Sequence, residues 1–246
     1  MADYRTIDAG ARAGSAAQID QGLRTHMNKV YGTMSVGLLL TALVAWAVGT
    51  NDALLSLFRD PQTLRPNILG YIAMFAPLGM IFAFGAAINR LSAAGAQLFF
   101  YVYAALFGLS ISYIFAAYTG ISITQTFLVT AIAFAGLSIF GYTTQKNLSG
   151  MGTFLMMGLI GLIVASIVNI FLGSGVLSFA ISAIGVLIFA GLTAYDTQKI
   201  KNDYLAHAHA MDSEWLAKSA IMGALSLYLD FVNMFMFLLS FLGNRD

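Results

Sequence analysis

Residues 147–195 read NLSGMGTFLMMGLIGLIVASIVNIFLGSGVLSFAISAIGVLIFAGLTAY, and none of them carries a charged side chain. A helix that crosses a membrane needs about 20 consecutive apolar residues, so the stretch between Lys146 and Asp196 has room for two. Gly173-Ser174-Gly175 supplies the turn between them. We expect helices because strands of a membrane barrel alternate apolar and polar residues, which this stretch does not do. A helix also satisfies its backbone hydrogen bonds within lipid.

Runs of the same kind fill most of the remaining chain. The run between Arg90 and Lys146 again has room for two helices, with Gly120 at the turn, and the last run contains a single charge, Asp230. The sequence therefore predicts an all-α integral membrane protein, a seven-transmembrane helix bundle. Its helices are expected at approximately 30–50, 68–89, 95–118, 123–143, 151–172, 176–197 and 218–242. A tail at 1–29 precedes this membrane domain of residues 30–242, and a short tail at 243–246 follows it.

The composition excludes several classes of protein. Hydrophobic residues make up 59% of the 246 residues and charged residues only 9%, whereas a soluble globular chain carries roughly 25% charged residues. A soluble enzyme, a nucleic-acid-binding protein and a disordered chain are therefore excluded. The chain has no cysteine, which removes disulfides, iron–sulfur clusters, thiolate zinc sites and thiol catalysis.

The distribution of positive charge predicts the orientation. With seven spans, nine of the twelve Lys and Arg residues fall on the side of the amino terminus. These nine are Arg5, Arg12, Arg24, Lys29, Arg90, Lys146, Lys199, Lys201 and Lys218, and the other three are Arg59, Arg65 and Arg245. Because Lys and Arg accumulate in cytoplasmic loops, the amino terminus is expected in the cytoplasm and the carboxyl terminus outside.

The first 29 residues differ from a signal peptide. They mix acids with bases and lack both an apolar core and a cleavage site. Residues 16–29 are compatible with a short helix on the membrane surface and equally with a partly ordered tail.

Asp230 lies about twelve residues into the seventh predicted span, near the middle of the membrane. A carboxylate at that depth costs a few kcal/mol even on the lenient insertion scale, so it normally faces the interior of a bundle and has a function. At 100° per residue, Ser226, Asn233 and Ser240 share its side of the helix. This polar stripe predicts the wall of a cavity or conduit, and Ser226 and Asn233 are candidate lining residues.

Asp196 ends the sixth predicted span on the cytoplasmic side. A carboxylate at the carboxyl end of a helix opposes the helix dipole and therefore needs a cation, a proton or a basic side chain. Arg90, at the cytoplasmic end of the second span, is the candidate counter-charge within the chain. The alternative is structural: Asp196 marks the membrane boundary, and Asp230 makes one hydrogen bond or ion pair. If the two carboxylates meet, like charge makes them titrate as a unit.

Two motifs resemble those of the Bax inhibitor-1 family, also called the transmembrane Bax inhibitor motif family, in its bacterial form. They are Gly191-Leu-Thr-Ala-Tyr-Asp-Thr-Gln-Lys-Ile-Lys201 and Ser226-Leu-Tyr-Leu-Asp-Phe-Val-Asn233. The resemblance runs from about residue 20 to the end of the chain. Seven spans and a cytoplasmic amino terminus are also typical of its bacterial members.

The resemblance implies a pH-sensitive calcium leak in a bacterial inner membrane. In similar proteins six helices surround a central seventh, and two aspartates lie near the cytoplasmic mouth of a closed pore. Those aspartates match Asp196 and Asp230, and an arginine of the second helix that pairs with them matches Arg90. An acidic residue that some relatives carry in the second helix has no counterpart, because residues 66–89 contain no acid. Related bacterial proteins have also been linked to regulation of a membrane-bound protease.

Enzymatic chemistry has little support in the sequence. A retinal protein needs a lysine midway along its last helix, whereas Lys218 stands at the start. An intramembrane serine protease needs a buried base beside its serine, and the histidines lie in the predicted tail and sixth loop. His207 and His209 offer a transition-metal site or a pH sensor; a solvated loop is the simpler interpretation.

The sequence thus predicts a calcium (cation) leak channel that is gated by protonation of Asp196 and Asp230 and has no catalytic residues. No cofactor is expected, and calcium is the ion expected at these two residues. The alternative is an interaction protein that binds a membrane-bound protease and needs neither acid. A secondary transporter that uses the same acids also stays open.

Overall fold

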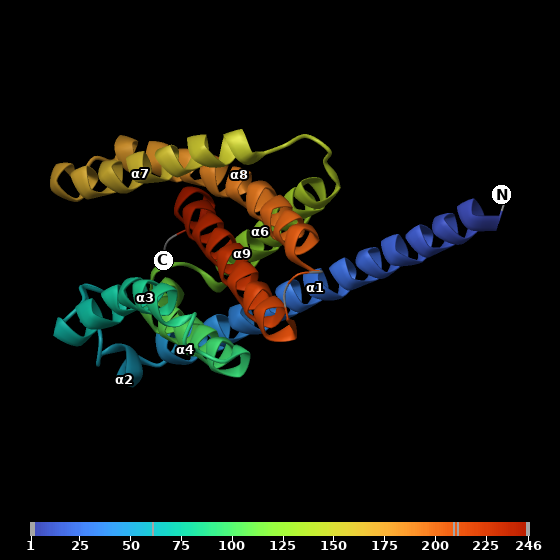
Figure 1. Ribbon diagram of the computed structural model, residues 1–246. Helices are drawn as coiled ribbons and strands as arrows, with labels where there is room; N and C mark the ends of the chain where they lie inside the picture. The colour runs from blue at the N-terminus through green and yellow to red at the C-terminus, as the bar shows by residue number, and fades with distance from the viewer. Residues whose placement is uncertain (1–2, 61, 209, 211, 245–246) are drawn as a thin grey trace.

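A computed structural model describes residues 3–60, 62–208, 210 and 212–244, with side chains from residue 18 onward. This described part of the chain is helical and contains no strand. Figure 1 shows the arrangement of its helices. In chain order they are α1 (Asp3–Gly49), α2 (Asp52–Leu55), α3 (Ile68–Ala87), α4 (Ala93–Ile111), α5 (Ile114–Ala117), α6 (Gly120–Thr143), α7 (Ser149–Leu172), α8 (Gly175–His207) and α9 (Ser213–Leu242).

Within the described residues, seven helices are long and apolar enough to cross a membrane. The expected all-α membrane protein with seven spans is therefore confirmed. The turns have physical causes that the sequence indicates. The side chain of Thr119 accepts a hydrogen bond from Ser122 N and caps α6, and Gly173 ends α7 with a φ of 59°. Ser174 then caps α8 through Leu177 N. The turn at Gly173 and Ser174 therefore divides residues 147–195 into two helices.

Three helices reach beyond the membrane lengths expected from hydropathy. α1 is continuous from Asp3, so residues 1–29 are no separate tail where the structure describes them, and Leu23 and Met27 are buried. α8 continues to His207, and α9 begins at Ser213 after Asp212 caps it through Trp215 N. Hydropathy marks where lipid ends, whereas a helix continues as long as its polar residues pack or cap.

α9 lies among the other helices and corresponds to the expected central seventh span. It packs against α8, α1, α6 and α4, while α3 packs mainly on α4 and α7 mainly on α8. Figure 1 shows α9 crossing the bundle between the pair α7–α8 and the pair α3–α4. Its Leu227, Tyr228 and Leu239 are completely buried. α9 thus packs between the pair α7–α8 and the pair α3–α4.

The loop before α3 is ordered by local contacts. The backbone amides of Gln62 and Thr63 donate to Asp60 and hold the pKa of that carboxyl below its usual value. Arg59 donates to Leu64 O at 2.9 Å, and its guanidinium lies 4.3 Å from the centre of the Tyr113 ring. These contacts fasten the loop over the end of the bundle that is remote from the N-terminus.

Candidate functional site

The second motif places Tyr228 and Asp230 on opposite faces of α9. Tyr228 and Asp230 are two positions apart, which is about 200° around a helix. The Tyr228 hydroxyl lies 2.6 Å from Thr41 Oγ1, and Thr41 Oγ1 lies 2.9 Å from the carbonyl oxygen of Ala104. One face of the motif therefore fastens α9 to α1 and α4, and the other carries the carboxylate.

Asp230 is buried, with 4% of its surface exposed. Its Oδ2 atom has no hydrogen-bond partner in the described structure. A buried and unpaired carboxylate is costly unless a proton or a cation neutralises it. Asp230 is therefore the strongest candidate for a site that binds protons or cations.

Asp196 lies close enough to Asp230 for the two carboxyl groups to interact electrostatically. It is half-buried on α8, the helix that packs most extensively on α9. Lys199, one turn further along α8, also interacts with it but is exposed. Among the described residues the one salt bridge joins Arg24 to Asp20, so neither Asp196 nor Asp230 has a basic partner at that distance.

No salt bridge joins Arg90 to either aspartate in the described part of the chain. Arg90 is exposed in the turn between α3 and α4 and makes none of the salt bridges found in the described chain. That turn is held by the start of α9, where Glu214 accepts from Ala93 N at 2.6 Å and Lys218 donates to Leu91 O at 3.1 Å. The counter-charge assigned to Arg90 has no support in this geometry.

The residues expected to line a conduit have ordinary helical roles. Asn233 donates to Leu229 O, one turn back in α9, and both Asn233 and Ser226 are half-buried. Ser240 pairs with Ser182 of α8 at 3.2 Å. The Ser240–Ser182 pair therefore joins α9 to α8, and the role of Ser226 and Asn233 as lining residues stays a prediction.

The structure adds two buried hydroxyl groups that the sequence did not single out, one of them next to Asp196 in the chain. Ser138 Oγ on α6 and Thr197 Oγ1 on α8 are buried without a hydrogen-bond partner among the described residues. Their helices pack on each other and on α9. The one signal in the sequence was the position of Thr197 next to Asp196. Ca²⁺ takes oxygen ligands, above all carboxylates, carbonyls and water.

The first motif also fixes the loop between α6 and α7. Gln198 donates to Lys146 O at 2.8 Å and accepts from Leu148 N at 2.8 Å. Lys201 donates to Tyr142 O at 2.7 Å. Gln198 and Lys201, which follow Asp196 in α8, therefore hold the end of α6 and the loop after it.

Of the two histidines considered for a metal site or a pH sensor, the structure describes only His207. His207 Nδ1 lies 2.9 Å from Asp203 O, and its ring packs on Trp215. His209 lies outside the described residues. In the part of the chain that the structure describes, no three His, Cys, Asp or Glu side chains gather as a metal site, so a cation at Asp196 and Asp230 would need other oxygen ligands.

Comparison with known proteins gives a consistent picture. Residues 23–246 match the family described as inhibitor of apoptosis-promoting Bax1. Inner membrane protein YbhL of Escherichia coli K12 is 46% identical over 97% of this chain and all of its own length. The uncharacterized protein RP147 of Rickettsia prowazekii is 46% identical over 92% of each chain. An uncharacterized membrane protein of Streptococcus pyogenes, SpyM3_0260, is 36% identical over 93% of this chain and 96% of its own.

Proposed function

Since this chain belongs to the Bax inhibitor-1 family of membrane proteins, we propose that it is a pH-sensitive leak channel for calcium with Asp196 and Asp230 as its ion-binding gate. One observation carries the proposal: Asp230 is 4% exposed, has an unpartnered carboxylate oxygen, and interacts with a second carboxylate. The proposed location is a bacterial inner membrane, with the amino terminus in the cytoplasm.

The proposed gate works through the charge of the carboxyl pair. Two carboxylates in one buried site repel each other, so a bound cation or a shared proton must compensate them. When both are ionised, at higher pH, a cation held between α8 and α9 locks the helices together. Protonation at lower pH removes that attraction, and the lock weakens. Acid should therefore increase the flux.

Two carboxylates suit a site through which calcium passes. Ca²⁺ takes six to eight oxygen ligands, and the described residues offer two carboxylates, with the unpartnered hydroxyl of Thr197 next to Asp196 in α8. Water would complete the shell and would keep the affinity moderate. Conduction needs binding that is weak enough for release. No catalytic residue and no cofactor enters this proposal.

Calcium flux into liposomes tests it. The purified chain, Asp196→Asn, Asp230→Asn and the double variant are compared at pH 6 and pH 8, with exposed Asp203→Asn as the control on α8. We expect faster flux at pH 6 in the native protein and in the control, and no pH dependence in the double variant. A double variant that keeps the native pH response, or a native protein with no flux above empty liposomes, contradicts the proposal.

A second candidate function is regulation of a membrane-bound protease by direct contact. The observation that favours it is the amino-terminal part of α1, which projects from the bundle as a single helix (Figure 1). A projecting helix is a surface on which a partner can dock, and neither Asp196 nor Asp230 is needed for it. Pull-down of a membrane protease by the native chain, but not by a chain without residues 1–17, would support this role.

A further inference from the structure

A groove of about 840 Å³ separates α1 from α6. α1 packs on α4 and α9, and α6 packs on α8 and α9, so the two helices flank α9 and leave a gap between them. Phe231 of α9 lies at the back of this groove. The volume is in the usual range of ligand sites, about 300–1,000 Å³.

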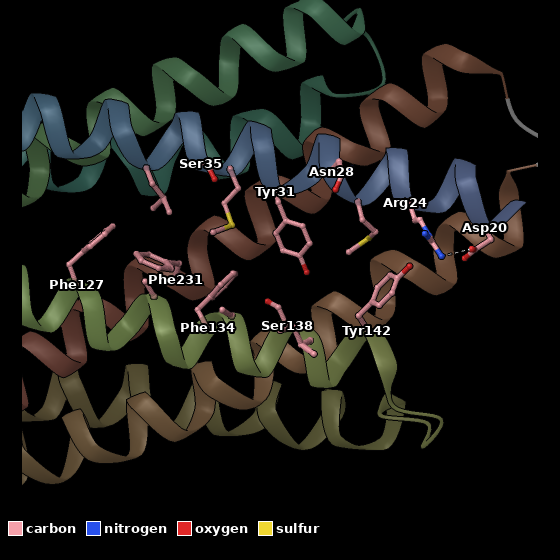
Figure 2. Close-up of a pocket in the computed structure, with 16 residues that line it drawn as sticks. Asp20, Arg24, Asn28, Tyr31, Ser35, Phe127, Phe134, Ser138, Tyr142 and Phe231 are labelled. Atoms are coloured by element: carbon pink, nitrogen blue, oxygen red, sulfur yellow. Dashed lines mark hydrogen bonds and ion pairs between the residues drawn. The ribbon is translucent and has the colours of Figure 1, made fainter. Parts of the chain in front are cut away.

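The groove changes from polar to apolar along its length (Figure 2). Nearest the amino terminus its walls carry Asp20, Arg24 and Tyr142. Phe127 of α6 and Phe231 of α9 lie at the other end. The apolar Leu38 of α1 also lines the groove. A ligand that fits both ends must be amphipathic, with a polar head at Arg24 and an apolar body beyond it.

A buried hydroxyl in the middle of the groove lacks a partner. Ser138 is 5% exposed, and its Oγ makes no hydrogen bond with any described residue. Thr130 on the same helix instead donates to Thr126 O at 2.7 Å, the usual solution for a hydroxyl in an apolar helix. Figure 2 shows Ser138 and Tyr31 pointing into the groove from opposite walls. A ligand with an acceptor at this level would satisfy both hydroxyl groups.

The surfaces on either side of the groove are those that lipid contacts. Leu39 and Leu43 of α1 and Leu128 and Ile132 of α6 are exposed apolar side chains. The groove therefore opens to the bilayer, and its occupant enters from there. From Ser138 to Phe127 is eleven residues, about 16 Å at 1.5 Å per residue. The hydrocarbon of one leaflet is about 15 Å deep, so the apolar part matches one acyl chain.

We infer that the groove between α1 and α6 binds one phospholipid of the leaflet on the amino-terminal side. Its phosphate lies at Arg24, an ester carbonyl accepts from Ser138 and Tyr31, and one acyl chain packs against Phe127, Phe134 and Phe231. Arg24 uses one nitrogen for Asp20 at 2.9 Å, and the remaining N–H groups of its guanidinium are able to donate to phosphate. This site is independent of ion conduction, because neither Asp196 nor Asp230 lines the groove.

Native mass spectrometry of the purified full chain with dioleoylphosphatidylglycerol tests the groove. Ala135→Trp fills it from the α6 wall, and Ile132→Trp places the same side chain on the lipid-facing surface of α6 as a control. We expect one tightly bound phospholipid in the native chain and the control, and affinity at least about tenfold weaker in Ala135→Trp. Equal retention by Ala135→Trp, or equal loss in the control, overturns the site.

Two further variants keep the test decisive if Ala135→Trp fails to fold. Ser138→Ala should weaken phosphatidylglycerol binding roughly two- to tenfold, the effect of one net hydrogen bond. Arg24→Gln should reduce the affinity for phosphatidylglycerol to that for dioleoylglycerol, which has the same chains without phosphate. If dioleoylglycerol or inorganic phosphate competes as well as phosphatidylglycerol against the native chain, the amphipathic site is overturned.

Discussion

At the scale of single residues, the motif at 226–233 contains one residue that holds α9 in place, Tyr228, and one candidate ion-binding residue, Asp230. Tyr228 has no exposed surface, and its ring packs edge to face against Phe100, Tyr103 and Phe107. Its hydroxyl reaches Thr41 on α1. Asp230 needs a helix that is held at a fixed rotation, because a turn of α9 about its axis would change the direction of the carboxylate. The tyrosine supplies that constraint.

Tyr228→Phe should lower the free energy of unfolding by about 1–2 kcal/mol, because it removes one buried hydrogen bond and leaves the oxygen of Thr41 without its donor. Thermal unfolding in a fixed detergent measures the change. Tyr71→Phe on α3, whose ring is half exposed, is the matched control and should change little. Equal effects of the two substitutions would mean that the Tyr228 hydroxyl contributes nothing specific.

Residue chemistry explains what the sequence could and could not predict about the site. The unusual position of Asp230 in an apolar run is visible in the sequence, because a charge in mid-membrane has a known cost. The unpartnered Ser138 is not visible, since serine is common in apolar helices and only the packed structure shows whether its hydroxyl bonds back to its own helix. Arg90 is charged and near the correct end, but its direction depends on a turn that hydropathy does not describe.

At the scale of helices, close contacts decide where α8 lies. A Cβ placed on Gly141 of α6 would collide with the carbonyl oxygen of Ala194 on α8. α6 and α8 therefore meet backbone to backbone, two residues before Asp196. Small residues allow such approach in membranes, where packing replaces the hydrophobic effect as the driving force. The depth and direction of Asp196 follow from this contact.

Gly141→Ala should destabilise the bundle by about 1–3 kcal/mol, because a methyl group has no room between the two backbones. Gly136→Ala on the same helix is the control, since a Cβ there meets open space. It should be neutral or stabilising by up to about 1 kcal/mol, through the helix propensity of alanine. Thermal unfolding of both variants decides, and a Gly136→Ala protein less stable than Gly141→Ala would contradict the contact.

Helix ends show the limit of hydropathy at this scale. The seven spans follow from the sequence because each depends only on the residues within its own run. The extensions of α1, α8 and α9 do not, because their polar residues stay helical through tertiary contacts such as that of His26 with Tyr204, whose ring centres are 4.9 Å apart. Relative rotation, and with it the groove between α1 and α6, is likewise a property of packing.

At the scale of the whole molecule, α1 has two parts with different roles. From Gln18 to Gly49 it is a candidate span that packs on α4 and α9. Before that it projects from the bundle in Figure 1. A leak channel requires only the packed part of α1, whereas an interaction protein would bind its partner through the projecting part. Truncations of different length at the amino terminus therefore distinguish the two functions.

Removal of residues 1–17 should leave thermal unfolding unchanged and calcium flux within about twofold of native, because the start of α1 projects from the bundle in Figure 1. Removal of residues 1–28 should destabilise the protein, since Leu23 and Met27 are buried and each contributes roughly 1.5–3 kcal/mol. Flux into liposomes and unfolding of each truncated chain give the answer. Loss of flux in the shorter truncation, with unchanged unfolding, would move the function to the projecting helix.

The charge asymmetry of the whole chain predicts its orientation in the membrane, and labelling of single introduced cysteines tests that prediction. Nine of twelve Lys and Arg residues lie on the amino-terminal side, which the positive-inside rule places in the cytoplasm. The chain has no cysteine, so Gln62→Cys in the loop before α3 and Gln145→Cys in the loop after α6 each introduce a single label site, and both positions are exposed. A membrane-impermeant maleimide applied to intact cells should label Gln62→Cys alone, and Gln145→Cys should react once the membrane is opened. The reverse pattern would invert the orientation, place the aspartate pair near the outer face, and require the gate to respond to external rather than cytoplasmic pH.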